Sequence, residues 1–457
     1  MPAQRELLRQ IGNTPLIELS GFDVGCCQLF VKLENQNPGG SIKDRIALSM
    51  IEAAEREGRI SPGGTVIEAT AGNTGLGLAC IGVLKGYQTL LVIPDKMSRE
   101  KVSHLRALGA KVVLTRSDVG KGHPEYYQDL AESIARETPN SLFVNQFCNP
   151  ANPLAHETST APEIWSQMGH NVDAIVCGVG SGGTLTGLSR FFARVQPELE
   201  MVLADPEGSI LAHYVHTGEV RTDAGSWLVE GIGEDFIPEI ADLSRVKKAY
   251  SISDRESLST ARELLRLEGI FGGSSAGTLV AAALRYCREQ TEPKRVVTFI
   301  CDSGNKYLSK MFSDLWMVDH GLLETEHFQD LRDLISHKYR DGRVVTVSPD
   351  DSLLTAYNRM RTNDISQLPV LRGGAIVGMI DESDILLAVR DQEARFKSCR
   401  VLDVMSDRLV TLSPRDSIDS LYAMLEHGLV AIVMDGAQFL GLVTKIDLLN
   451  YLRRRTA

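Results

Sequence analysis

The sequence has no run of about 18 apolar residues, and its beginning, MPAQRELLRQIGN, contains no apolar core. A membrane-spanning helix needs about 20 consecutive apolar residues, and a signal peptide needs a shorter apolar stretch near its start. The sequence therefore predicts a cytoplasmic protein that has no membrane span.

Basic residues are also few, with 48 Lys and Arg against 59 Asp and Glu and a formal net charge of −11. The only dense basic run is Arg453–Arg455, where cations suit the end of a helix. An acidic protein is a poor partner for nucleic acid, so we expect none. The eight cysteines lack the paired spacing of zinc sites, and we predict free thiols and no metal site.

Short apolar runs alternate with amphipathic segments from Thr65 to Phe147, and again from Ala174 to Asp302. The runs are TVIEAT, TLLVIP, KVVLT, AIVCGVG, EMVLAD and VVTFICD. Strands rich in Val, Ile and Leu with helices between them predict an α/β fold, in which parallel sheets are covered by helices on both faces. Ligands bind such sheets at the loops that follow the strands.

An internal repeat follows. VVTVSPDDSL at 344–353 matches LVTLSPRDSI at 409–418, and GMIDESDILL at 378–387 matches GLVTKIDLLN at 441–450. Each copy predicts strand, helix, strand, strand and helix, and we expect the copies to pack together because one alone has too little core. The predicted organisation is a domain at 1–321 with a mobile subdomain at about 41–147, a charged linker helix at 322–342, and a module at 343–457 with repeats at about 343–396 and 404–455.

The first loop with candidate chemistry contains Lys43, which follows Gly39 and Gly40 at a predicted helix start. A helix N-terminus disfavours positive charge, which lowers the pKa of the amine and helps it react with an aldehyde. A solvated surface lysine is the alternative.

The second loop is Thr70–Gly75, between a strand and an apolar helix. Its backbone amides and hydroxyls suit a substrate carboxylate, and Asn73 supplies an amide for a ring hydroxyl. A simple helix cap is the alternative.

The third loop, Gly178–Thr184, is the most specific, because glycines admit a close ligand and the following helix favours a phosphate. Gly178, Gly180 and Gly183 also satisfy G-x-G-x-x-G, and Asp205 closes the next strand, so a nicotinamide-dependent oxidoreductase is a rival interpretation.

The fourth loop contains Ser303, whose hydroxyl could face a heterocycle nitrogen, although an ordinary turn residue is the alternative. Together the four loops supply the parts of a pyridoxal 5′-phosphate site, whereas a dinucleotide enzyme explains only the third.

On these residues the sequence resembles the cystathionine β-synthase family, within the fold type II (tryptophan synthase β-like) pyridoxal phosphate enzymes. The matching segments are IGNTPL at 11–16, KLENQNPGGSIKDR at 32–45, TAGNTG at 70–75, NPLAH at 152–156 and GVGSGGTLTG at 178–187. Cysteine synthases share several of these segments. ADPEGSIL at 204–211 and VEGIG at 229–233 are more similar to cystathionine β-synthases.

The resemblance implies that serine and homocysteine condense to cystathionine and water, with hydrogen sulfide production possible when cysteine is a substrate. The implied roles are Schiff-base formation by Lys43, a bond to the cofactor 3′-oxygen by Asn73, and a contact to the pyridine nitrogen by Ser303. The implied phosphate ligands are Gly180, Ser181, Gly182, Gly183 and Thr184, and the implied carboxylate ligands are Thr70, Ala71, Gly72, Thr74 and Gln146. Two alternatives stay open: a cysteine synthase that uses O-acetylserine and sulfide, and a nucleotide-sensing scaffold without catalysis.

The sequence departs from the family at three places. It has no segment with Cys and His before IGNTPL, so we expect no haem. Glu234 stands where many relatives have tyrosine, and Glu157 where relatives often have an aromatic residue, both expected near the site entrance.

The repeats resemble a tandem pair of adenosyl-binding CBS motifs, a Bateman module. The resemblance implies that Asp384, Thr444 and Asp447 bind S-adenosylmethionine, AMP or ATP, although they could simply cap helices. It also implies a homodimer or a higher homo-oligomer.

Overall fold

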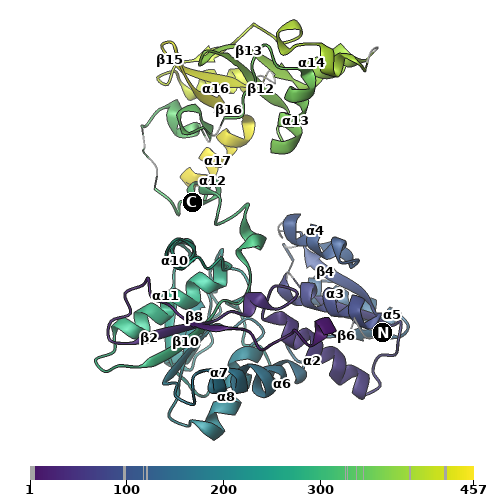
Figure 1. Ribbon diagram of the computed structural model, residues 1–457, viewed down its shortest axis with the longest axis vertical. Coiled ribbons are helices and arrows are strands. Elements are labelled where there is room, and N and C mark those ends of the chain that lie inside the picture. Colours follow the sequence, from purple (N-terminus) through teal and green to yellow (C-terminus); the bar gives the residue numbers. More distant parts are fainter. Residues whose placement is uncertain are drawn as a thin grey trace. The chain divides into compact units, whose positions relative to one another are not determined.

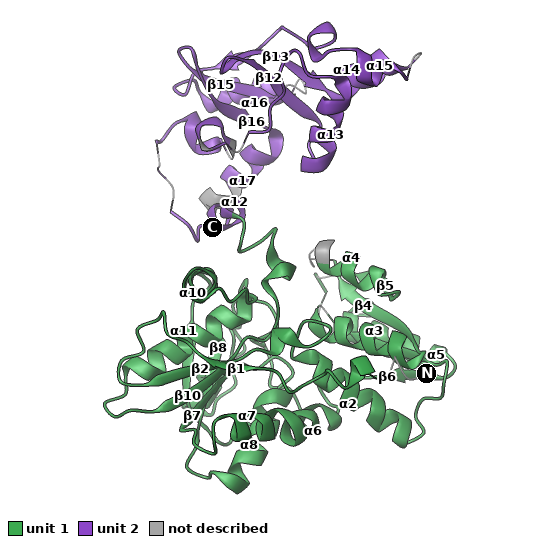
Figure 2. Ribbon diagram, viewed as in Figure 1, with its two compact units in different colours: residues 1–313 green, residues 314–457 purple. Residues whose placement is uncertain are grey.

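The structure is a computed structural model that describes residues 6–70, 72–95, 99–116, 118–119, 122–324, 326, 328–335, 337–342, 344–390, 393–426 and 430–456. The chain divides into two compact units, Met1–Ser313 and Asp314–Ala457 (Figures 1 and 2). Among the described residues, no helix is both long and apolar enough to cross a lipid bilayer.

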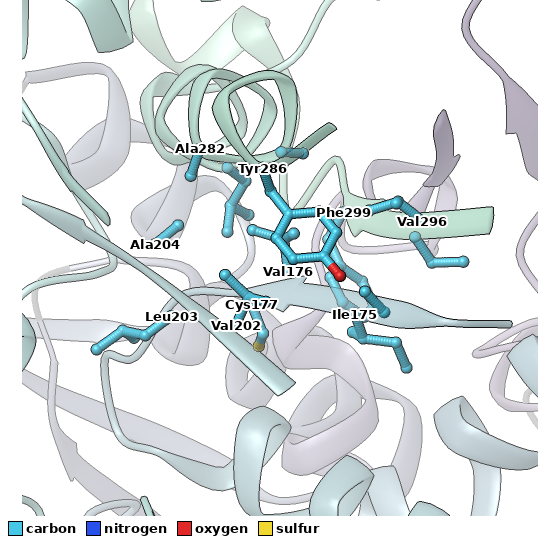
Figure 3. Packing of buried hydrophobic residues seen from close by; sticks show 14 of the residues in the cluster. Ile175, Val176, Cys177, Val202, Leu203, Ala204, Ala282, Tyr286, Val296 and Phe299 are labelled. Atoms are coloured by element: carbon cyan, nitrogen blue, oxygen red, sulfur yellow. The ribbon is translucent and has the colours of Figure 1, made fainter. Parts of the chain in front are cut away.

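A six-stranded sheet forms the core of the first unit, in the order β1-β2-β10-β7-β8-β9. Every neighbouring pair is parallel except β1 with β2. The strands are β1 (Leu16–Glu18), β2 (Gln28–Lys32), β7 (Ala174–Cys177), β8 (Glu200–Pro206), β9 (Val246–Ile252) and β10 (Arg295–Phe299). Its helices include α7 (Ala161–Gln167), α8 (Gly183–Val195), α9 (Leu211–Thr217), α10 (Asp254–Glu268) and α11 (Ser274–Arg288). In Figure 3, Val176 and Val202 of the sheet lie among the same buried side chains as Ala282 and Tyr286 of α11.

A second sheet of the same unit has four parallel strands in the order β5-β4-β3-β6. The strands are β3 (Thr65–Ala69), β4 (Gln88–Pro94), β5 (Lys111–Thr115) and β6 (Ser141–Phe143). The associated helices are α2 (Lys43–Arg56), α3 (Asn73–Lys85), α4 (Arg99–Ala107), α5 (Tyr127–Glu137) and α6 (Ala151–Ala155), which continues as a π-helix (His156–Thr160). The predicted parallel strands and the helices between them are therefore confirmed, and the glycine-bearing loops at Thr70–Gly75 and Gly178–Thr184 each follow the carboxyl end of a strand.

The second unit contains both copies of the repeat. In the first copy, α13 (Leu353–Asn363) precedes β12 (Gln367–Arg372), β13 (Ala375–Asp381) and α14 (Glu382–Val389). In the second, β14 (Thr411–Leu412) precedes α16 (Ile418–Glu426), β15 (Ala431–Asp435), β16 (Gln438–Val443) and α17 (Lys445–Thr456). The predicted order of elements is confirmed, with one difference. The opening strand of the first copy is reduced to a single bridge between Val347 and Val370.

The predicted linker helix at 322–342 is wrong. The described part of this segment forms two 3-10 turns, Leu331–Leu334 and Tyr339–Asp341, and a short strand β11 (His337–Lys338) paired with β16. Leu331, Leu334 and Ile335 are buried in the apolar cluster of the second repeat. Burial of these apolar side chains stabilises the segment packed against the second repeat more than it would an isolated charged helix. The segment therefore belongs to the second unit.

Candidate active site

Lys43 is the first residue of α2, and its half-buried side chain lines a cleft with Asn73 and the glycine loop. Burial lowers the pKa of the Lys43 amine, because a charged group loses hydration there, while the nearby Cys301 and Cys177 act in the opposite direction. The predicted direction of the pKa shift is thus confirmed, with burial as its main cause. A lysine with a lowered pKa provides the neutral amine that an aldehyde requires.

The glycine loop between β7 and α8 forms a cradle with little room for side chains. A Cβ added to Gly180 would lie 2.5 Å from the carbonyl oxygen of Gly231, and Gly182 has a φ of +88° that favours glycine. The loop opens the N-terminus of α8, where unpaired amides and the dipole attract an anion. Gly180, Ser181, Gly182, Gly183 and Thr184 all line the cleft that contains Lys43. These donors fit a phosphate group.

Two residues of the NPLAH segment form hydrogen bonds with side chains of this glycine loop. Asn152 donates from Nδ2 to the Ser181 Oγ at 2.9 Å and to the Gln146 carbonyl at 2.8 Å. His156 contacts the Thr184 hydroxyl through Nε2 at 3.2 Å. Burial lowers the pKa of His156 well below its ordinary value, so the imidazole is neutral. The NPLAH motif is visible in the sequence, but its letters alone do not indicate these roles of Asn152 and His156.

The second predicted loop lies beside the cleft. Thr70, Gly72, Asn73, Thr74 and Gln146 line a larger cavity that also contains Lys43. The Thr74 hydroxyl donates to the Gln146 Oε1 at 2.6 Å, which joins α3 to the loop after β6. Ala71 lies outside the described residues.

Asn73 is fixed at both ends of its amide. Its Nδ2 donates to Asp302 at 2.8 Å, and its Oδ1 accepts from the Lys306 ammonium at 2.7 Å. Asp302 is fully buried and also accepts from the Tyr307 hydroxyl at 2.9 Å. These contacts orient Asn73 at the rim shared by the cleft and the larger cavity.

Ser303 is not brought together with the other predicted residues. Its hydroxyl caps the following 3-10 helix by accepting from the Asn305 amide at 3.3 Å, and it lines a different cavity together with His104 and Lys306. The serine that lines the Lys43 cleft beyond the glycine loop is Ser275, near the start of α11. The turn G-G-S-S-A-G at 272–277 is a signal that could have found it, because it opens an apolar helix like the other loops.

The rival dinucleotide interpretation needs an accessible carboxylate on Asp205. That side chain is fully buried, and it accepts from the Ala212 amide at the start of α9 at 2.8 Å. Burial also raises the pKa of Asp205 to about 6. An acid used in this way cannot bind a ribose, so this interpretation is not supported.

Known families match both units. The family described as pyridoxal-phosphate dependent enzyme matches residues 7–302, and the CBS domain matches residues 331–391 and 401–454. The chain belongs to the pyridoxal-phosphate dependent enzyme family. A cystathionine beta-synthase from Oryctolagus cuniculus is 36% identical across 98% of this chain and 85% of its own length. The first unit therefore has the fold type II architecture, and the predicted pair of CBS domains is confirmed.

Solved structures also match this chain, and two of them are informative here. A hydrogen sulfide-producing enzyme from Fusobacterium nucleatum has a TM-score of 0.62 and 37% identity, and covers 66% of this chain and 99% of its own. An O-acetylserine dependent cystathionine beta-synthase from Helicobacter pylori has a TM-score of 0.61 and 36% identity, and covers 66% of this chain and 97% of its own.

Glu234 and Glu157, the two expected departures from the family, lie in different places. Glu234 lines the larger cavity with Lys43. Glu157 instead pairs with Arg194 of α8 at 2.7 Å and is absent from the described lining of that cavity. The expectation that both lie at the site entrance is therefore wrong for Glu157.

In the CBS domains, the predicted ligand residues cap helices. Asp384 accepts from the Asp381 amide at 3.0 Å and completes a capping box at the start of α14. Asp447 accepts from the Thr444 amide and hydroxyl at 2.7 and 2.5 Å. Each of the three side chains thus makes a structural contact at the start of a helix.

Proposed function

We propose that this protein binds pyridoxal phosphate at Lys43 and condenses serine with homocysteine, releasing cystathionine and water. The observation that carries the proposal is the half-buried Lys43 side chain, which shares one cleft with the anion cradle and adjoins the carboxylate loop. Relatives named cystathionine beta-synthase match nearly the whole chain, CBS domains included, which supports this reaction over that of a cysteine synthase.

The hydrogen-bond donors that line the cleft indicate which residues would hold the cofactor. The α8 amides with the Ser181 and Thr184 hydroxyls suit the phosphate, and Asn73 suits the 3′-oxygen. Ser275 replaces Ser303 as the proposed partner of the pyridine nitrogen, since this residue lines the cleft. When bound, pyridoxal phosphate supplies an aldehyde that joins an amine and withdraws electrons from the substrate α-carbon.

The side chains and backbone of the protein bind the substrate carboxylate and transfer protons. Thr70, Gly72 and Thr74 hold the serine carboxylate by hydroxyl and backbone donors, with Gln146 bound to Thr74. With the cofactor bound, the Lys43 amine would remove the substrate α-proton and donate a proton to the departing β-hydroxyl, which leaves as water. The thiol of the second substrate would form the new bond at the β-carbon, and Lys43 would carry the thiol proton to the α-carbon. A neutral hydroxyl at the pyridine nitrogen favours elimination over a long-lived carbanion, because it does not keep that nitrogen protonated.

The decisive experiment is the absorbance spectrum of the purified protein with pyridoxal phosphate, before and after borohydride. We expect a yellow protein that borohydride bleaches, with the added mass on Lys43. Lys43→Ala should lose that label and all turnover, whereas the exposed Lys111→Ala should keep both. A colourless protein with an unmodified amine at position 43 would refute the proposal.

A second candidate is a cysteine synthase, which uses O-acetylserine in place of serine and sulfide in place of homocysteine. The Helicobacter pylori structure is that of an O-acetylserine dependent enzyme, and its match to this chain favours testing that leaving group. Steady-state rates with serine and O-acetylserine, each with homocysteine and with sulfide, separate the candidates. A large preference for O-acetylserine with sulfide would assign a cysteine synthase instead. Cysteine as substrate tests for the production of hydrogen sulfide.

For the second unit, we propose an adenosyl ligand for the CBS domains and a homo-oligomeric assembly. Calorimetry with S-adenosylmethionine, AMP and ATP tests the ligand, and Asp447→Ala should abolish any heat observed. Absence of heat and of a thermal shift with all three compounds would count against a regulatory site.

A further inference from the structure

Two segments that resemble those of cystathionine β-synthases, ADPEGSIL at 204–211 and VEGIG at 229–233, meet at Glu234. Ser209, from ADPEGSIL, accepts the Glu234 amide at 3.1 Å and donates to the Glu234 carbonyl at 3.1 Å. Ile210 of the same segment donates its amide to that carbonyl, also at 3.1 Å. Glu234 directly follows VEGIG, and its amide and carbonyl are therefore both hydrogen-bonded to residues of ADPEGSIL.

Further contacts fix the rest of this loop against the cavity. The Gly233 amide donates to the Val179 carbonyl in the glycine loop at 2.8 Å. The Leu228 amide donates to the Asp254 carboxylate at 2.9 Å, and the Glu230 amide to the Ser274 hydroxyl at 3.0 Å. A loop tied at three points presents its side chains in a defined position, as recognition requires.

Three other charges in this cavity are paired with one another. Lys101 and Lys310 both bind Glu230, one to each carboxylate oxygen. Within the described residues, the Glu234 carboxyl has no hydrogen bond or ion pair, while its charge and that of Lys43 each shift the pKa of the other. Glu234 thus places an unused acidic group in the substrate cavity, near the proposed reactive amine.

Resting on the proposed function, we propose that Glu234 binds the ammonium group of the second, thiol-bearing substrate. The residue would therefore select aminothiols, such as homocysteine, over sulfide or thiols that lack an amine. The amine of the first substrate is consumed at the cofactor, and its carboxylate has the Thr70–Thr74 loop. The ammonium group of the second substrate needs an acidic partner of its own.

The electrostatics of the cavity agree with this role. Burial and the neighbouring Asp235 raise the pKa of Glu234 to about 8. Without a cation beside it, the carboxyl is therefore largely protonated at neutral pH. An ammonium group stabilises the ionised carboxylate, and a charge-assisted hydrogen bond out of bulk water is stronger than a neutral one. Sulfide offers no cationic donor for this contact.

The test compares Glu234→Gln and Glu234→Asp with wild type at saturating donor amino acid. The varied substrates are homocysteine, 4-sulfanylbutanoate, which lacks only the ammonium group, and sulfide. We expect Glu234→Gln to lower kcat/KM for homocysteine roughly 10- to 100-fold, mainly through KM, and to change the values for the other two less than about threefold. Glu234→Asp keeps the charge and should recover part of the loss. Glu239→Gln is the matched control, since it removes an exposed carboxylate of the same loop.

An equal loss with all three thiols would assign Glu234 to thiol deprotonation or to structure, and would overturn the inference. Unchanged use of homocysteine by Glu234→Gln would overturn it as well. The spectral change on adding serine should be the same in variant and wild type, which checks that the first substrate still binds. Wild-type protein that forms no cystathionine from either donor would refute the proposed function itself, a result distinct from a selective failure of the variant.

Discussion

At the scale of single residues, buried ionisable groups explain several of the motif positions. Glu68 on β3 is buried next to the substrate loop, where its carboxyl accepts from the Gln146 amide at 3.2 Å. Burial raises the pKa of Glu68 to about 8. The side chain therefore supports the loop mainly in its protonated form at neutral pH.

This raised pKa predicts the pH dependence of stability. Between about pH 4.5 and 8 the unfolded carboxyl is ionised while the folded one stays protonated, so stability falls as pH rises, by up to about 1.4 kcal/mol per pH unit. We expect Glu68→Gln to flatten this slope, since glutamine keeps an acceptor and cannot ionise. Urea unfolding at pH 5, 6 and 7 measures it, with the exposed Glu132→Gln as control. Identical slopes in wild type and Glu68→Gln would contradict the assignment.

A second set of buried charges connects IGNTPL to the lysine loop. Glu34 binds Arg45 at 2.7 Å, with both side chains at 2% exposure or less, and accepts from the Thr14 hydroxyl at 2.7 Å. The motif residues Thr14 and Arg45 therefore have a structural role close to Lys43 in the chain.

Removing the charge of Glu34 should be costly. We expect Glu34→Gln to lower the free energy of unfolding by about 3 kcal/mol, because Arg45 stays buried with one carboxylate fewer. Arg59→Gln, which breaks the exposed pair with Glu57, should cost less than about 1 kcal/mol. Chemical denaturation of both variants provides the comparison. Equal small losses would show that the buried pair adds nothing.

At the scale of elements, the site is assembled from loops at the carboxyl ends of strands in two different sheets. The glycine loop follows β7 of the large sheet, and the carboxylate loop follows β3 of the small sheet. Asn152, on α6, links Ser181 of the glycine loop to the Gln146 carbonyl, and the Gln146 side chain in turn accepts from Thr74 of the carboxylate loop. We infer that α6 sets the distance between the phosphate and carboxylate positions.

These hydrogen bonds of Asn152 predict an effect on cofactor affinity that can be measured without substrate. Asn152→Ala should weaken the binding of pyridoxal phosphate to cofactor-free protein about tenfold, as expected for the loss of a buried hydrogen bond of about 1.4 kcal/mol. Fluorescence titration measures it without any turnover, and the exposed Asn171→Ala should bind as wild type does. Wild-type affinity in Asn152→Ala would refute the bridging role.

At the scale of the whole molecule, the two CBS domains leave apolar side chains in water at equivalent positions. Leu386 of α14 is 67% exposed and Leu449 of α17 is 60% exposed, and the two occupy matching places in the repeats. Leu387 and Ile446 on the same helices are 66% and 61% exposed. Repeated exposure of leucine on both helices favours an interface with a second copy of the chain.

Charges introduced on these helices should therefore disrupt assembly. We expect Leu386→Glu combined with Leu449→Glu to lower the molar mass in solution by light scattering, because a carboxylate opposes burial of the face. Leu265→Glu, at an exposed leucine of α10, serves as the control. An unchanged mass in the double variant would exclude this face as an interface between copies.

The sequence by itself determined the strands, the helices between them and the repeat, and it predicted the reactive role proposed for Lys43. These features depend on residues close in the chain: apolar periodicity, glycine at strand ends, and duplication. The role of Lys43 could be proposed from the sequence because residues close to it in the chain also form its surroundings in the fold.

Only the tertiary structure decided which side chains face the cleft. It placed Ser275 there rather than Ser303, used Asp205 and Asp447 as helix caps, and folded Leu331–Ile335 onto the second repeat. Orientation and burial depend on contacts between segments far apart in the chain, and local patterns carry no information about them. For the same reason Glu234 stood out in the sequence only as a departure, and became a candidate specificity residue once its cavity was known.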